Sequence, residues 1–120
     1  HALPNVLSEI SDDELTSVYH KEGNKYDLIV GDLKVKPISQ MQVRLALLLG
    51  MKNLMETGTD ATLSRDMLVD ICKYYGAHDS ANFATNMKKN RQYFLPKGKD
   101  WALTVPGQKK AAELIKELAQ

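Results

Sequence analysis

Four polar residues of the segment 80–91 have the spacing of one helix face and side chains that suit contact with nucleic-acid bases. Asn82, Thr85, Asn86 and Lys89 recur at intervals that place them along one stripe of a helix. Asparagine can form a paired hydrogen bond with adenine, and lysine can contact guanine or phosphate. The alternative is that these residues only populate a solvated helix face.

Further cations give the C-terminal third of the chain a positive charge. Residues 80–112 hold seven basic residues against one acid, a net charge of +6: Lys88, Lys89, Arg91, Lys97, Lys99, Lys109 and Lys110. Flexible lysines can follow a phosphate backbone without sequence demands, although ordinary solubility is the alternative explanation. Residues 1–33 carry a net charge of −5. This acidic segment is expected either to face a basic partner or to shield the basic segment.

Three helices are predicted between residues 39 and 90. The first begins at Ser39, which has capping-box spacing with Gln42, and it ends at Gly58; its broad apolar surface predicts a buried, central helix. The second begins at Ser64 and closes at Gly76. The third is capped by Asp79 or Ser80 and reaches about Asn90, with an inner face formed by three apolar residues: Phe83, Ala84 and Met87.

A strand, a turn, a second strand and a last helix follow. Residues 93–95 and 101–104 are predicted to be strands joined by a turn at 96–100, and Trp101 is expected in the core. Pro106 suits a helix start, and the last helix has a regular apolar face: Ala111, Leu114, Ile115 and Leu118. Lys109 and Lys110 are expected in its first turn, where cations oppose the helix dipole.

The N-terminal segment is predicted to be an acidic arm, residues 1–38, ahead of a domain at residues 39–120. Ser11 caps a short helix that closes at Gly23. Residues 26–36 alternate in polarity around Gly31-Asp32, which predicts a tight hairpin or, alternatively, one irregular strand that leads to Pro37.

The segment Trp101-x-Leu103-Thr104-x-x-Gly107-x-x-x-Ala111-x-x-Leu114 resembles the wing strand and closing helix of many bacterial and archaeal regulators. Together with the order of elements, it makes residues 39–120 similar to the winged helix-turn-helix family. The resemblance implies a mainly α domain with a small β-hairpin, of α+β class. The tightest family pattern has an apolar residue about six positions after the turn glycine. Here that position is Asn82 and the apolar residue is Phe83, so the turn after Gly76 is longer by about one residue.

The resemblance also implies binding of double-stranded DNA through the third helix, about residues 80–91, and a basic wing at 96–100. Such a module would serve a transcription regulator or a larger DNA-processing protein. The expected contacts are ten residues: Asn82, Thr85, Asn86, Lys88, Lys89, Arg91, Lys97, Lys99, Lys109 and Lys110. The alternative is a winged helix that joins a protein partner or a second copy through residues 1–56, without DNA contact.

Other function classes find no support in the sequence. The three histidines and the single Cys72 form no catalytic or zinc-binding motif, so no enzyme, metal, cofactor or small-molecule ligand is indicated. Cys72 is expected to be a small buried apolar residue. No apolar run is long enough for a membrane span, and a cytoplasmic location is expected, with nucleoid or nuclear association if DNA is bound. The start at His1 suggests a piece of a longer protein.

Overall fold

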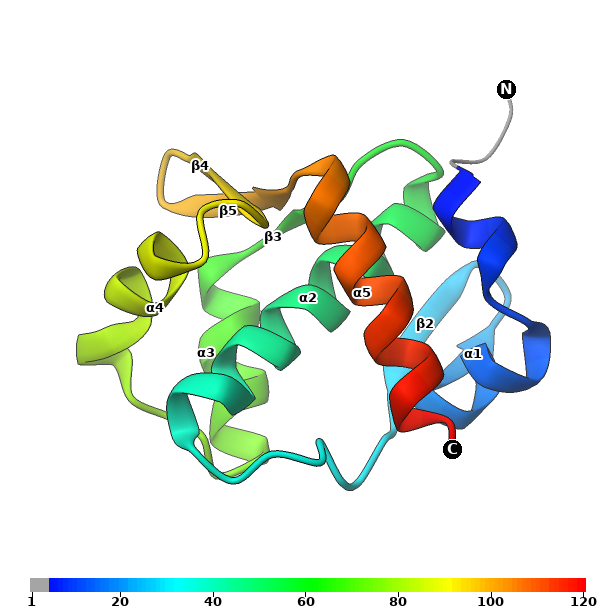
Figure 1. The fold of residues 1–120 in the computed structure, drawn as a ribbon, viewed down its shortest axis with the longest axis horizontal. Helices are drawn as coiled ribbons and strands as arrows, with labels where there is room; N and C mark the ends of the chain where they lie inside the picture. Colours follow the sequence, from blue (N-terminus) through cyan, green and yellow to red (C-terminus); the bar gives the residue numbers. More distant parts are fainter. Residues whose placement is uncertain (1–4) are drawn as a thin grey trace.

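Helices and two small antiparallel sheets make up the fold in a computed structural model, which describes residues 5–120 (Figure 1). In chain order the elements are η1 (Asn5–Glu9, a 3₁₀ helix), α1 (Asp12–Val18), β1 (Tyr19–Glu22), β2 (Lys25–Leu28), α2 (Ile38–Thr57), β3 (Thr62–Leu63), α3 (Arg65–Tyr74), η2 (Ser80–Asn82, a 3₁₀ turn), α4 (Phe83–Lys89), β4 (Phe94–Lys97), β5 (Asp100–Leu103) and α5 (Val105–Leu118). The α+β class predicted from the sequence is confirmed. Within residues 5–120, no helix combines the length and the apolarity that crossing a membrane requires.

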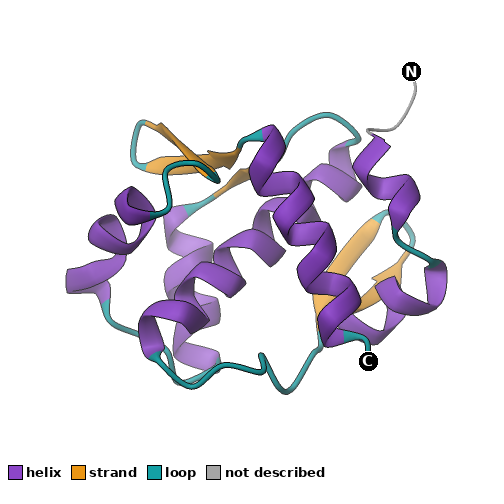
Figure 2. Ribbon diagram, in the orientation of Figure 1, coloured by secondary structure: helices purple, strands orange, loops and turns teal. Residues whose placement is uncertain are grey.

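The larger sheet has the strand order β3-β5-β4, with every pair antiparallel. The short strand β3 was not expected from the sequence. It joins the sheet by pairing with β5, where Leu63 lies opposite Trp101. In Figure 2 this sheet lies at one edge of the helical part, and the hairpin of β1 and β2 lies near the opposite end of the molecule. The turn of the larger hairpin is tighter than predicted, since β4 extends through Pro96 to Lys97 and Gly98 has a φ of +62°.

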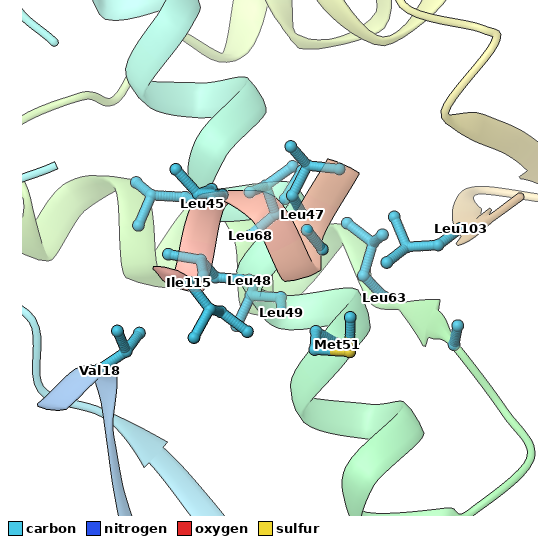
Figure 3. Packing of buried hydrophobic residues seen from close by; sticks show 14 of the residues in the cluster. Val18, Leu45, Leu47, Leu48, Leu49, Met51, Leu63, Leu68, Leu103 and Ile115 are labelled. Carbon is cyan, nitrogen blue, oxygen red and sulfur yellow. The ribbon is translucent and has the colours of Figure 1, made fainter. Parts of the chain in front are cut away.

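The core is built around α2, as its broad apolar surface predicted. Leu45, Leu48 and Met51 are buried, and Figure 3 draws them with apolar side chains of the surrounding elements. Gly50 lets the sheet approach this helix closely, because an added Cβ would lie 2.5 Å from Cγ of Leu103. Burial of apolar side chains on this scale is the main source of folding free energy.

Residues of the N-terminal segment belong to the same apolar cluster. Val18, Tyr19 and Leu33 are buried with the side chains of α2 and α5. The Tyr19 hydroxyl donates a hydrogen bond of 2.6 Å to the Leu48 carbonyl. At the C-terminal end of α5, the Lys34 ammonium donates to the Glu117 carbonyl at 2.6 Å. The described part of this segment is therefore packed onto α2 and α5 rather than extended as a free arm.

The N-terminal hairpin forms earlier in the chain than predicted. Its strands are β1 and β2, with Glu22 opposite Lys25, whereas Gly31-Asp32 lies in an irregular stretch. Gly23, with a φ of +60°, takes the first loop position, where glycine favours a type II′ turn. Consequently α1 ends at Val18 and not at Gly23.

Several helix ends follow the local signals. Ser11 forms a complete capping box with Glu14, Ser64 accepts from the Met67 amide, and Gly58 ends α2 with a φ of +82°. The capping box predicted at Ser39 is wrong. Helix α2 begins at Ile38 without a side-chain cap, because the Gln42 side chain is buried and bonded elsewhere.

The Thr104-x-x-Gly107 pattern has a steric and a hydrogen-bonding cause. Thr104 Oγ1 accepts from the Gly107 amide at 3.0 Å and donates to the Gln92 carbonyl at 2.5 Å. The Thr104 amide donates to the Tyr93 carbonyl at 2.9 Å. A Cβ at Gly107 would clash with that same carbonyl, so the start of α5 is held against the loop before β4. The buried face predicted for α5 is confirmed.

Candidate nucleic-acid interface

Four cations line one cleft between α4, the start of α3 and the β4–β5 hairpin, which is the predicted wing. The cleft has a volume of about 480 Å³. We call it the basic cleft, and its charged lining residues are Arg65, Lys88, Arg91 and Lys99. Its floor is apolar and includes Met87, Phe94 and Trp101. Three of the cations were predicted as contacts from the sequence, and the structure brings them together.

Helix α4 contributes to the cleft through one stripe. Ala84, Lys88 and Arg91 recur at helical spacing, with Arg91 just beyond the end of the helix. Ala84 was predicted to face inward, but it is exposed. Phe83 and Met87 are buried and fix the opposite side of the helix to the core. The small Ala84 side chain leaves the space that makes this surface concave.

The wing is held beside α3 by backbone contacts. Strand β5 pairs with β3, and the Asp100 carboxylate accepts a hydrogen bond of 3.0 Å from the Arg65 amide. Lys99 Nζ lies 3.6 Å from an Asp66 carboxylate oxygen, with both side chains largely exposed. A pair of this kind contributes little stability and leaves the ammonium accessible to a stronger anionic partner.

Arg65 was missed by the sequence reasoning. It follows the Ser64 cap and carries no local signal of function. The pairing of β3 with β5 and the Arg65–Asp100 hydrogen bond bring the start of α3 beside the hairpin. An interaction between residues about 35 positions apart has no signature in helical or strand periodicity.

None of the remaining four predicted cations lines the basic cleft. Lys89 and Lys110 line a second concavity, which is described below as the helical groove. Lys97 and Lys109 are exposed and belong to the lining of neither. Helix α5 begins at Val105, so Lys109 and Lys110 lie in its second turn and not in its first.

The predicted polar stripe on the third helix is only partly exposed. This helix begins at Phe83, and Asn82 lies in the 3₁₀ turn ahead of it, where its side chain donates to Asp79 at 2.7 Å. Thr85 is exposed, but Asn86 is buried at 8% exposure. Asn86 is therefore not an outward-facing base contact. It lies three residues after Phe83, on the face that packs inward.

Asn86 instead completes a buried hydrogen-bond network. Its amide donates to Gln42 Oε1 at 2.6 Å. Gln42 Nε2 donates to the carbonyls of Ala77 and Asp79 at 2.9 and 3.3 Å. The network connects α2, the turn after α3, and α4. It fixes the orientation of α4 because buried polar groups lose stability when they are left unpaired.

The acidic N-terminal segment does not cover the basic cleft. In Figure 1 the α1 and β2 region lies at one end of the long axis, and α4 and the wing lie at the other. The ion pair that this segment forms with α5 joins Glu14 to Lys116 at 3.5 Å. The described residues of the acidic segment therefore do not cover the basic cleft, and its interaction with a basic partner stays a prediction.

The chain has been compared with protein-family models, with curated proteins and with solved structures, and none of them matches it.

Proposed function

We propose that this chain is a winged-helix module that binds double-stranded DNA through α4 and the β4–β5 wing. The observation that carries the proposal is the basic cleft, where four cations converge. Two acids lie beside it: Asp66 pairs with Lys99 at 3.6 Å, and Asp100 accepts from the Arg65 amide. Cations that neutralise phosphates supply most of the affinity in such complexes, through release of counterions. The element order and the β3-β5-β4 sheet support the winged-helix assignment.

Contacts within this site divide by chemistry. Lys88 and Arg91 would contact DNA phosphates beside α4, while Lys99 would contact DNA phosphates from the wing. Asn82 and Thr85 are the exposed groups left for base edges, since Asn86 is used in the core. A surface with many phosphate contacts and few base-reading side chains favours weak sequence discrimination.

The protein-interaction alternative has less support. It placed a partner surface within residues 1–56, where the large apolar side chains Val18, Tyr19, Leu33 and Leu45 are already buried in the chain's own core. Ile29 and Ile38 are the large apolar side chains exposed among the described residues of this region, and exposed apolar residues in such small number are ordinary for a protein surface.

Charge reversal within the cleft tests the proposal. Lys88→Glu/Arg91→Glu is expected to weaken binding to a labelled 20-base-pair duplex by a factor of about 30 or more in low salt. The matched control is Lys73→Glu/Lys109→Glu, which makes the same change of charge at exposed positions outside the cleft. Fluorescence anisotropy measures both, and circular dichroism verifies that each variant is folded.

Salt dependence provides a second measure. Four phosphate contacts predict that log K falls against log salt with a slope of roughly −3 to −4. The proposal fails if the unmodified chain does not bind duplex at low salt. It also fails if the two double variants lose affinity equally, because the effect would then reflect net charge and not the cleft.

A further inference from the structure

A groove separate from the basic cleft runs between α2 and α5 and is closed at one end by the last turn of α4. We call it the helical groove; its volume is about 580 Å³. This volume lies within the range found for small-molecule sites. It is formed by segments around residues 40, 90 and 113, so no contiguous motif in the sequence could indicate it.

Four apolar side chains form a patch within the groove, and its other lining residues are polar or charged. Val43 and Leu47 of α2 face Leu114 of α5 across it, and Tyr93 contributes an aromatic ring from the loop before β4. Leu47 and Leu114 are almost fully buried, while Val43 and Tyr93 are half-buried. This lining suits a flat apolar body, because such a body would remove the remaining exposed parts of Val43 and Tyr93 from water.

The charges around the groove are unevenly paired. Arg44 lies 2.8 Å from Glu117 and also donates to the Leu33 carbonyl, so this pair is satisfied within the chain. The hydrogen bond from Arg44 lowers the pKa of Glu117, and the charges of Lys34 and Lys110 lower it further, which keeps that carboxylate ionised. Lys89 and Lys110 remain, with Glu113 as the other acid of the lining. Neither lysine has an ion pair within 4 Å among the described residues.

We infer that the helical groove binds a small amphipathic organic anion, which has a flat apolar body and one carboxylate, sulfonate or phosphate group. The body lies on Val43, Leu47, Tyr93 and Leu114, and the anionic group lies between Lys89 and Lys110. The amides of Gln40 and Gln92 at the rim can donate further hydrogen bonds to it. The site does not require that the chain bind DNA, because it shares no cation with the basic cleft.

The test uses 8-anilinonaphthalene-1-sulfonate, which has an aromatic body and one sulfonate. The dye is titrated into the folded chain and its fluorescence is measured. We expect the signal to saturate with one dye molecule bound per chain. Lys89→Glu/Lys110→Glu is expected to raise the dissociation constant about tenfold or more, since close charges contribute strongly to affinity in partly desolvated sites. Lys97→Glu/Lys109→Glu makes the same change of charge at exposed positions outside both the groove and the basic cleft, and is expected to change the constant less than about twofold.

Three results would overturn the inference. One is the absence of saturable binding, and another is an equal loss of affinity in both double variants. The third is a set of amide shifts in a ¹H–¹⁵N spectrum that lies on the wing and spares α5 and residues 89–93, because the probe would then occupy the basic cleft. Near-UV circular dichroism of Trp101 shows that each variant keeps its tertiary packing, which excludes dye binding to a loosened core. Failure here leaves the duplex-binding result untouched, since that experiment reverses Lys88 and Arg91.

Discussion

The side-chain amide of Asn86 donates a 2.6 Å hydrogen bond to the side chain of Gln42, across 44 residues of sequence. Both residues are buried, and every buried side-chain nitrogen or oxygen of the described residues has a partner. This pair joins α4 to the central helix, so it determines how the candidate DNA-contacting helix sits on the core.

Removing either member of this pair should destabilise the fold. Gln42→Leu and Asn86→Leu are each expected to cost about 1–3 kcal/mol, because each leaves a buried polar group without its partner. The double variant should lose less than the sum by about 1 kcal/mol. Urea unfolding measures all three, with Thr85→Leu as an exposed control on the same helix. Strict additivity would show that the two side chains are not coupled.

Gly107→Ala tests the contact between α5 and the loop before β4. An alanine in a helix is ordinarily more favourable than glycine by about 1 kcal/mol. Here its Cβ would meet the Tyr93 carbonyl, so a loss of roughly 1–3 kcal/mol is expected instead. Thermal and urea unfolding measure the difference. Gly31→Ala is the control, since a Cβ there meets nothing within 4 Å. An increase in stability for Gly107→Ala would contradict the close approach.

Deletion of residues 1–36 tests the predicted boundary between an arm and a domain at residue 38. The deletion removes Val18, Tyr19 and Leu33 from the apolar cluster and exposes the surfaces of α2 and α5 that they cover. Each such side chain contributes about 1.5–3 kcal/mol when buried, so cooperative unfolding should be lost or strongly weakened. Calorimetry compares the two chains. A sharp, unchanged transition for residues 37–120 would show that the C-terminal part folds alone.

Alkaline pH should destabilise the chain from about pH 9 upward. Burial raises the pKa of the Cys72 thiol from 9.0 to about 12, and burial also raises the pKa of Tyr19 well above 10.0. Between pH 9 and about 12 the unfolded thiol loses its proton while the folded one keeps it, so the free energy of unfolding falls with pH. Cys72→Ala should flatten this fall in that window, whatever its effect at neutral pH. Urea unfolding at a series of pH values measures this fall. If the free energy of unfolding fell equally with pH in both chains, the buried Cys72 thiol would not be its cause.

Local chemistry in the sequence was sufficient to predict the helix ends at Ser11, Gly58 and Ser64. It also predicted the junction at Thr104, where β5 ends and α5 begins. In each case the interacting groups lie within four residues, so the hydrogen bond or the left-handed φ is a property of the segment itself. The apolar periodicity of α2 and α5 was equally informative, because a helix with such a face must bury it.

Tertiary structure alone decided the role of residues whose partners are distant in the chain. Gln42 had local spacing that suited a cap, but packing against Asn86 and the Ala77 carbonyl placed it in the core. The hairpin register, the addition of Arg65 to the basic cleft, and the separation of Lys88 from Lys89 likewise depend on which elements pack together. The sequence by itself determined that positive charge gathers in residues 80–112. Which of those cations share a surface depends on long-range packing, since neighbouring residues on a helix point about 100° apart.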